Sequence, residues 1–591
     1  MTIPWKSPIS AEWLTLSQKK FGTIVLDGDT IYWDELRPSE GGRTAIVQCS
    51  PQGKQREMIP DHLSARSRVH EYGGAPFAVT QEKVYFVNDK DQRIYLDSTP
   101  LTEPGIRFAD LHIQGSYLVA VGEKGHDNFL ACLHLPTKTL TKLAEGHDFY
   151  ASPAFNPAGN QIAFLTWDHP QMPWDGTELW LADFIDGTLS NLRKIAGGEN
   201  ESIFQPSWSP EGVLHFVSDK TSWWNLYQWD GQQAVPLHPS SAEFGLPQWI
   251  FGMSTYAFAG NKVLAASLSN GKWSLSGYNL PWTFYTQIRA SSNFAVFIAG
   301  SSTQDKSVIK LDLTTGKTTT LAHNIHPPLD PGYISTPEFL TYPSAKGRVA
   351  HAFYYPPRNK DYQSSDLPPL VVMTHGGPTA GTNSTFDLKI QYWTSRGIAV
   401  LDVDYGGSTG YGRAYRDALK GHWGIVDVED CEAGARFLTQ QKKVDPSKIA
   451  IRGGSAGGYT TLAALTFGSV FTVGASYYGI GDLTALAEET HKFESRYLDS
   501  LVGPYPASKA LYEERSPLFH VDKLRCPVIF FQGSEDLVVP PNQAEKMYEA
   551  LQSRGIKTEL VIYEGEQHGF RQAHNIRDSL EKELAFYLSI F

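Results

Sequence analysis

Short apolar runs alternate with polar turns along the first 325 residues of the chain. The runs are rich in β-branched and aromatic residues, the turns in Gly, Asp, Asn and Pro, and no long amphipathic helix follows residue 20. This alternation predicts an all-β array. Candidate units of the array begin near Gly22, Gly73, Phe108, Tyr150, Phe204, Leu246 and Phe284.

These units recur at a period of roughly forty residues, which is the length of a four-stranded propeller blade. The segments 152–159 and 205–212 are the clearest copies, because each has Pro, an aromatic residue, Pro and Gly at the same spacing. We therefore predict a β-propeller, with seven blades as the best fit and six or eight as alternatives. An array of separate β-sandwiches is the structural alternative, but such an array has no reason to share one period.

Two further segments define the predicted domain borders. Residues 10–20 read as a short helix that we expect to dock near the C-terminal domain, and the Pro-rich stretch 322–335 reads as the crossing between domains. The prediction is an N-terminal segment over residues 1–20, a propeller over 21–325 and an α/β domain over 326–591.

Ser455 lies in the pentapeptide Gly-Gly-Ser-Ala-Gly, which has the pattern G-x-S-x-G. Residues 448–451 before it read as a buried strand and residues 459–465 after it as the start of a helix. A strand, a sharp glycine turn and a helix are typical of the nucleophile elbow of α/β-hydrolases. A phosphate-binding turn is the alternative, but a Walker loop needs a Lys after its glycines and none follows here.

Asp536 and His568 follow Ser455 in the chain order that an α/β-hydrolase triad requires. Each comes after an apolar strand, so that all three side chains are expected at the carboxyl edge of one sheet. The carboxylate then orients the imidazole, and the imidazole takes the proton of the serine. Glu535 is a rival for the acid, although adjacent side chains at a strand end point apart.

The segment 370–378 predicts a strand that leads into a glycine pair, a pattern that suits an oxyanion-hole loop. We expect the backbone N–H groups of Gly377 and Ala456 to bind the oxyanion. One such donor is typically worth ~3 kcal/mol of transition-state stabilisation. His375 precedes the serine, which is the wrong order for a catalytic base, and we interpret it as a residue that shapes the loop.

Six segments together resemble the prolyl oligopeptidase family, and specifically its acylaminoacyl-peptidase and dipeptidyl-aminopeptidase branch. The resemblance covers the predicted C-terminal domain and implies an α/β-hydrolase fold there, with a propeller at the other end of the chain. The segments are HGGP (375–378), YGGSTGYG (405–412), WGIVDVEDC (423–431), GGSAGGY (453–459), GSEDLVVPPNQ (533–543) and EGEQHGF (564–570).

The resemblance also suggests substrate-binding residues. A propeller glutamate anchors the free amino terminus in related dipeptidyl peptidases, and Glu201 lies in a similar acidic turn, for which a solvated turn between blades is the alternative. Arg68 and Glu71 belong to a polar cluster. This cluster either faces the cavity expected between the propeller and the triad or forms a turn leading into a blade. Phe493 and Tyr497 resemble the aromatic segment of the first specificity pocket, with simple core packing as the alternative.

The composition of the chain argues against several classes of function. The net charge of −12 and the pI near 5.8 argue against binding to nucleic acid or to an anionic membrane. The four cysteines are scattered without metal-ligand spacing, so neither a disulfide framework nor a metal site or other cofactor is expected. The start of the chain lacks signal-peptide features and no stretch of eighteen apolar residues occurs. A cytoplasmic location is therefore predicted.

These patterns predict a serine peptidase that removes amino-terminal residues from short peptides, of aminopeptidase, dipeptidyl-peptidase or acylaminoacyl-peptidase type. A propeller over the triad excludes folded proteins and admits short peptides through a pore or a side opening. A carboxylesterase or amidase is the alternative with the same chemistry. A binding propeller fused to an inactive hydrolase is the alternative of another class, and it requires a lost triad residue. The oligomeric state is left open.

Overall fold

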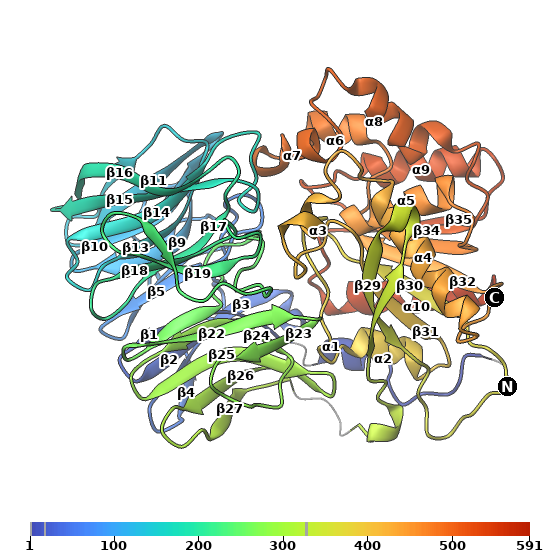
Figure 1. Cartoon of the computed structure of the whole chain (residues 1–591), viewed down its shortest axis with the longest axis horizontal. Helices are drawn as coiled ribbons and strands as arrows, with labels where there is room; N and C mark the ends of the chain where they lie inside the picture. The colour runs from blue at the N-terminus through green and yellow to red at the C-terminus, as the bar shows by residue number, and fades with distance from the viewer. Residues whose placement is uncertain (1–2, 17–18, 325–328) are drawn as a thin grey trace.

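The computed structural model describes residues 3–16, 19–324 and 329–591. In these ranges the chain forms seven small antiparallel sheets, followed by one sheet of eight strands. Figure 1 shows the small sheets grouped on one side of the molecule and the large sheet with its helices on the other. The predicted domain boundary near residue 325 lies outside the described residues.

Each small sheet is built from strands that follow one another along the chain. The first four sheets contain β1 (Lys20–Asp27), β2 (Thr30–Arg37), β3 (Arg43–Cys49) and β4 (Gln55–Glu57); β5 (Phe77–Thr80), β6 (Lys83–Val87), β7 (Ile94–Leu96) and β8 (Thr99–Pro100); β9 (Arg107–Gln114), β10 (Tyr117–Lys124), β11 (Asp127–His134) and β12 (Thr139–Ala144); β13 (Phe149–Phe155), β14 (Gln161–Trp167), β15 (Thr177–Ile185) and β16 (Thr188–Gly198). The last three contain β17 (Ile203–Trp208), β18 (Leu214–Ser218), β19 (Asn225–Trp229) and β20 (Ala234–Pro236); β21 (Tyr256–Ala259), β22 (Lys262–Ser269) and β23 (Lys272–Leu275); β24 (Phe284–Ala290), β25 (Phe294–Ser301), β26 (Gln304–Asp312) and β27 (Thr318–Ala322).

The first strand of every small sheet lines one central cavity of about 580 Å³, which is the channel of a propeller. Four of these inner strands carry a β-bulge with a residue in the left-handed region, where φ lies near +50°. A bulge bends its strand and increases the local twist. The bulged residues are Asp110, Ser152, Gln205 and Gln287.

The prediction of a seven-bladed β-propeller is thus confirmed. Five of the predicted unit starts lie in an innermost strand, and the two aligned segments begin within β13 and β17. Gly73 and Leu246 instead lie in the loops before β5 and β21. Both loops reach the other domain, and their glycine and aromatic residues resemble the start of a blade.

Apolar side chains between neighbouring blades hold the ring together. Between the first and last blades, for example, Trp33 and Val47 pack in one buried cluster with Val296 and Val308. The described residues show no strand exchanged between these two blades. Their junction depends on this packing and on side-chain hydrogen bonds, such as that from Gln55 to the carbonyl of Leu321 at 2.6 Å.

The large sheet has the strand order β28-β29-β31-β30-β32-β33-β34-β35. β28 and β29 pair antiparallel, β29 also pairs antiparallel with β31, and all other pairs are parallel. The prediction of an α/β-hydrolase domain is confirmed. The strands are β28 (Glu338–Pro343), β29 (Val349–Tyr355), β30 (Leu370–Thr374), β31 (Ala399–Asp404), β32 (Ile449–Gly454), β33 (Val473–Tyr477), β34 (Val528–Gly533) and β35 (Thr558–Tyr563).

Alternate side chains of the parallel strands enter two buried clusters on opposite faces of the sheet. Val371 and Ile529 join the cluster of α2 and α10, whereas Val372 and Phe530 join the cluster of α4, α5 and α9. This period of two is expected for strands covered on both faces. The helices are α1 (Trp13–Leu16), α2 (Leu388–Thr394), α3 (Arg413–Asp417), α4 (Val426–Gln440), α5 (Ala456–Phe467), α6 (Leu483–Glu489), α7 (Tyr497–Leu501), α8 (Lys509–Arg515), α9 (Asn542–Gln552) and α10 (Ala573–Leu588).

The N-terminal segment packs on this α/β domain, on the face that α2 and α10 cover. Ile9, Ala11 and Leu14 are buried in the same cluster as Trp393. The short helix α1 contacts α2 and α10. The segment therefore belongs to the core of the α/β domain although the propeller follows it in sequence.

Two propeller loops from opposite sides of the ring meet at the end of the channel that faces the α/β domain. The backbone N–H of Phe251 donates to Gly73 at 2.9 Å, and Gly74 and Phe251 form a parallel bridge. Ala75 and Gly252 line the channel cavity, on one side of this junction. The joined loops therefore lie between the channel cavity and the α/β domain.

Candidate active site

Ser455 occupies the sharp turn between β32 and α5, with φ 57° and ψ −123°. Such a backbone conformation costs of order 1–3 kcal/mol for a residue with a Cβ. The neighbouring glycines are needed because the chain is crowded here: a Cβ on Gly453 would lie 2.1 Å from the Thr374 hydroxyl, and a Cβ on Gly457 2.2 Å from the Thr374 carbonyl oxygen. The predicted strand, turn and helix are present, and the Ser455 hydroxyl reaches the cavity described below.

The structure brings Ser455, Asp536 and His568 together at the carboxyl edge of the sheet. Nε2 of His568 lies 2.8 Å from Oγ of Ser455, and Nδ1 of His568 lies 2.8 Å from Oδ2 of Asp536. The other oxygen of Asp536 accepts hydrogen bonds from the N–H groups of Val538 and Val539, both at 2.9 Å. The buried carboxylate is thus held so that one oxygen faces the imidazole, which suits a base that takes the serine proton.

The rival acid Glu535 takes no part in this arrangement. Its side chain is exposed, while that of Asp536 is buried. The N–H of Glu535 donates to the carbonyl of Glu566, which fixes the turn.

Two carboxylates act on the imidazole of His568. Burial disfavours the imidazolium and by itself lowers the pKa of His568. The charge and hydrogen bond of Asp536, together with the charge of Glu494, act in the opposite direction and prevail. The pKa of His568 is therefore raised above the ordinary histidine value of about 6.5.

The glycine loop after β30 lies against the nucleophile. A Cβ on Gly376 would lie 3.2 Å from the carbonyl oxygen of Gly454 and 3.5 Å from the Cβ of Ser455, so this glycine lies directly beside the nucleophile turn. Gly377 has φ 124°, a conformation that favours glycine. Ala456 is the first residue of α5, where backbone N–H groups have no partner within the helix. Gly377 lines the cavity together with Ser455, and Ala456 follows Ser455 at the start of α5; their role as oxyanion donors stays a prediction.

His375 is largely enclosed in the same loop, and its ring nitrogens contact groups other than Ser455. Its Nε2 lies 2.7 Å from the Ser408 hydroxyl and its Nδ1 2.8 Å from the carbonyl oxygen of Gly376. Burial lowers the pKa of His375 to about 4, against the opposing effect of the Gly376 hydrogen bond. The imidazole is therefore neutral and its contacts shape the loop.

A cavity of about 430 Å³ surrounds Ser455, and both domains line it. Its two propeller residues are Tyr72 and Trp249, which extend from the joined loops. The Tyr72 hydroxyl donates to Oε1 of Glu494 at 2.8 Å, and Nε1 of Trp249 donates to the carbonyl of Thr379 at 2.7 Å. The lining residues are Tyr72, Trp249, Gly376, Gly377, Ala380, Gly454, Ser455, Tyr478, His568 and Gly569.

Phe493 and Tyr497 lie behind this wall and do not line the cavity. The ring of Phe493 packs 5.9 Å from that of Trp249 and 6.1 Å from that of Tyr72. The hydroxyl of Tyr497 accepts the N–H of Thr379 at 3.1 Å. Both residues support the lining side chains, so the alternative of core packing describes their contacts better than direct contact with substrate.

The structure does not bring Glu201, Arg68 or Glu71 to this cavity, because partners in the propeller hold each of them. Oε1 of Glu201 accepts the Ser218 hydroxyl at 2.6 Å. Arg68 pairs with Asp89 and Glu71 pairs with Arg107. The cluster around Arg68 nevertheless contains Tyr72, which does line the cavity. Sequence reasoning missed Trp249 and Tyr478, for which no motif gave a signal.

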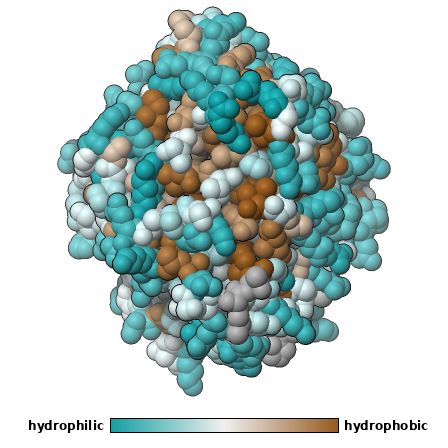
Figure 2. Space-filling view, turned by 90° about the vertical axis from the view of Figure 1, so that its right-hand side faces the viewer, coloured by the Kyte–Doolittle hydropathy of each residue, from teal (hydrophilic) through white to brown (hydrophobic). Residues whose placement is uncertain are grey.

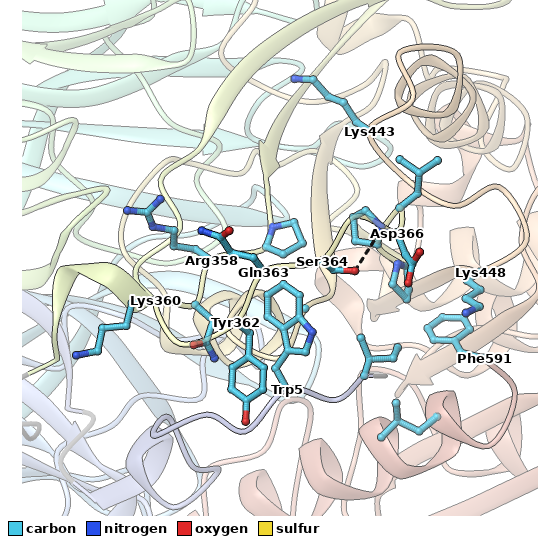
Figure 3. A pocket seen from close by; sticks show the side chains of 18 of the residues that line it. Trp5, Arg358, Lys360, Tyr362, Gln363, Ser364, Asp366, Lys443, Lys448 and Phe591 are labelled. Carbon is cyan, nitrogen blue, oxygen red and sulfur yellow. Dashed lines mark hydrogen bonds between the residues drawn. The ribbon is translucent and has the colours of Figure 1, made fainter. Parts of the chain in front are cut away.

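A larger cavity, of about 1070 Å³, lies far from this site, where the two chain ends meet the α/β domain. Figure 3 shows Trp5, Tyr362 and Phe591 there together with Arg358 and Lys448. Figure 2 shows hydrophobic residues gathered on the face of the molecule at that end. No triad residue lines this cavity, so it is not part of the catalytic site.

Two classes of feature are not found in the described ranges. No group of three or more His, Cys, Asp or Glu side chains there is placed to hold a metal ion. No helix there is long and apolar enough to cross a membrane.

Comparison with known proteins agrees with this geometry. A family profile described as "Prolyl oligopeptidase family" matches residues 384–591. Dipeptidyl aminopeptidase BIII of Pseudoxanthomonas mexicana is 31% identical over 223 residues, which are 37% of this chain and 32% of that protein. The match thus spans about a third of the length of that curated relative.

Solved structures match over the whole length. A puromycin-hydrolyzing peptidase of Mycobacterium tuberculosis is 38% identical with a TM-score of 0.95, and the match covers 99% of this chain and 97% of that one. A puromycin hydrolase is 36% identical with the same TM-score and the same coverage. On the combined evidence of the fold, the site and these matches, the chain belongs to the prolyl oligopeptidase family.

Proposed function

We propose that this protein is a serine peptidase that removes amino-terminal residues from short peptides through an acyl-enzyme. The observation that carries the proposal is the chain of contacts from Asp536 through His568 to Ser455, at 2.8 Å each, inside a cavity of about 430 Å³. That volume is at the small end of ligand-binding pockets. The cavity therefore suits a short acyl group.

Catalysis follows from the positions of these groups. His568 takes the hydroxyl proton while Ser455 attacks the scissile carbonyl, and Asp536 stabilises the imidazolium that forms. The N–H groups of Gly377 and Ala456 stabilise the negative charge on the carbonyl oxygen. The tetrahedral intermediate then expels the amine, which receives the proton from His568. Water hydrolyses the acyl-enzyme by the same steps.

The propeller limits which substrates reach Ser455. The joined loops lie between the channel cavity and the α/β domain, which favours a route other than a pore through the propeller. We infer that short peptides enter at the side, between the two domains. Two features of relatives support a peptide substrate: the names of the matched peptidases and a solved complex of a puromycin hydrolase mutant with PGG.

The substrate class is tested by comparing alanyl, alanyl-alanyl and N-acetyl-alanyl 4-nitroanilides with the corresponding 4-nitrophenyl esters. A peptidase hydrolyses at least one anilide with a kcat/KM close to that of its ester. Rapid hydrolysis of the esters alone would identify a carboxylesterase, and no turnover of either series would support an inactive hydrolase.

A cytoplasmic location remains part of this proposal. All four cysteines are free, which is typical of proteins from a reducing compartment. Fractionation of the native host, with detection of the protein by antibody, tests it.

The activity is expected to rise with pH as His568 loses its proton, because only the neutral imidazole accepts the serine proton. The raised pKa of His568 moves this rise to a pH above about 6.5. The measurement is kcat/KM of the best anilide from pH 5 to 10 in buffers of constant ionic strength. An optimum below pH 6, or activity lost on chelation, would contradict the mechanism.

A further inference from the structure

Glu494 is a carboxylate in contact with the cavity wall, and it has no role in the catalytic triad. It ends the 3₁₀ helix η4 (Lys492–Glu494), and 12% of its side chain remains exposed. Its Oε1 accepts the hydroxyl of Tyr72, which lines the cavity. Burial and then the charge of Glu494 raise the pKa of Tyr72, so the hydroxyl keeps its proton and remains a donor.

No cationic side chain balances this carboxylate. In the described part of the chain, neither lysine nor arginine forms an ion pair with Glu494. Some buried carboxylates do have such partners, as Glu583 pairs with Arg452 at 2.7 Å. Others, such as Asp404 and Asp427, form no ion pair with lysine or arginine in the described residues. Glu494 differs from these because its hydrogen-bond donor Tyr72 lines the cavity, so a cationic group of a ligand there would meet an unneutralised carboxylate.

His491, beside Glu494, is a polar residue without a hydrogen-bond partner among the described residues. Its Nε2 lies 3.6 Å from Oε2 of Glu494, and its ring packs edge-on against Tyr72. Neither ring nitrogen of His491 has a hydrogen-bond partner in the described residues, although both are buried. An unpaired buried polar group costs ~1–3 kcal/mol. Within the described ranges, Glu494, which has no lysine or arginine partner, and His491, which has no hydrogen-bond partner, therefore both adjoin the cavity wall.

The position of Glu494 fits the α-ammonium group of an aminoacyl substrate. The ammonium nitrogen lies only about 2.5 Å from the scissile carbonyl carbon, which itself approaches the serine oxygen to about 3 Å. The ammonium must therefore lie close to Ser455 and to the His568 ring. The charge of Glu494 already acts on His568, so it acts on an ammonium in this space as well. One further residue would move the ammonium away by about 3.5 Å.

We propose that Glu494, positioned by Tyr72 and flanked by His491, binds the free α-ammonium group of substrates that carry a single amino-terminal residue before the scissile bond. This specificity role rests on the proposed peptidase function and deepens it. The residue that binds the ammonium group is then Glu494 of the α/β domain and not Glu201 of the propeller, which the sequence analysis suggested.

The test compares Glu494→Gln with wild type on alanyl and N-acetyl-alanyl 4-nitroanilides, at a pH above the rise in activity. Loss of one member of a buried charged pair typically weakens binding by ~2 kcal/mol or more, which corresponds to about 30-fold. We expect kcat/KM for the alanyl substrate to fall by at least about 30-fold and that for the acetylated substrate to change by less than about threefold. Tyr72→Phe, which keeps the carboxylate but removes the donor that orients it, is expected to lower only the alanyl value, by several-fold.

Glu488→Gln is the matched control. Glu488 accepts a hydrogen bond from Tyr505 in the same domain, but this pair is exposed and away from the cavity. The control is expected to alter neither substrate by more than about twofold. Equal losses on both substrates in Glu494→Gln would overturn the proposal, as would a loss that appears in Glu201→Gln instead.

A binding experiment separates this proposal from the peptidase proposal itself. Alaninamide is expected to slow fluorophosphonate labelling of Ser455 in wild type but not in Glu494→Gln, and N-acetylalaninamide is expected to slow it in neither. This outcome without anilide turnover would sustain the ammonium site while the peptidase function fails. Anilide turnover with no protection by alaninamide at any concentration up to its solubility would overturn the ammonium site alone.

Discussion

Replacing Ser455 by alanine is expected to lower kcat for peptide hydrolysis by ~10⁵- to 10⁶-fold, the typical loss when a triad nucleophile is removed. The hydroxyl performs the attack, and among the described residues its hydrogen-bond partner is His568. Little packing is therefore lost, and the free energy of unfolding should change by less than about 1 kcal/mol. Steady-state kinetics and thermal melting of purified protein measure the two effects.

Ser447→Ala supplies the matched control for the nucleophile. Ser447 is an exposed serine in the turn just before β32, at the opposite end of the strand that presents Ser455. This variant should retain wild-type activity and still react with a fluorophosphonate. An adduct located by mass spectrometry on a serine other than Ser455, or activity above about 1% in Ser455→Ala, would disprove the assignment.

The variant Asp536→Asn is expected to lower kcat by ~10⁴-fold, the usual consequence of the wrong imidazole tautomer. The backbone hydrogen bonds that Asp536 accepts explain why this tautomer is expected. Val538 and Val539 donate N–H groups to one oxygen of Asp536, so the amide oxygen of asparagine must occupy that position. The amide NH₂ then faces Nδ1 of His568 and forces it to accept a hydrogen bond. Nε2 carries the proton in that tautomer and cannot take another from Ser455.

Glu535→Gln is the appropriate comparison for this variant, since it makes the same chemical change one residue away on an exposed side chain. It should leave kcat within about twofold. A ¹H NMR spectrum of the downfield imidazole region would check the tautomer in Asp536→Asn directly. Similar losses in the two variants would show that both act through a general change of the turn and not through His568.

The local part of the site could be predicted from sequence because each element of it is encoded over a few residues. Ser455, Asp536 and His568 each follow an apolar run that forms a parallel strand, and such strands end at one edge of a sheet. The glycines around Ser455 and at Gly377 mark places where a side chain has no room. The period of the propeller was also visible, because six of the seven blades repeat four antiparallel strands with turns between them.

The walls of the cavity could not be predicted, because they depend on how the two domains meet. Trp249 lies in a loop without any catalytic motif, and it lines the cavity because the propeller ring brings this loop to the α/β domain. Phe493 is an aromatic residue of the kind that lines apolar pockets. The rings of Tyr72 and Trp249 pack against it, however, and these two rings line the cavity in its place. Glu201 bonds to Ser218 of the neighbouring strand, a contact that the acidic turn alone does not reveal.

The junction between Gly74 and Phe251 also constrains how related proteins can diverge. Loops between blades usually accept changes of length and composition freely. Here a Cβ on Gly74 would lie 2.5 Å from the carbonyl oxygen of Phe251, so neither loop can be altered without moving the other. Tyr72 and Trp249 extend from these same loops into the cavity. Insertions or deletions in one loop should therefore be accompanied by changes in the other, so that the two sides of the pocket wall are inherited as one unit.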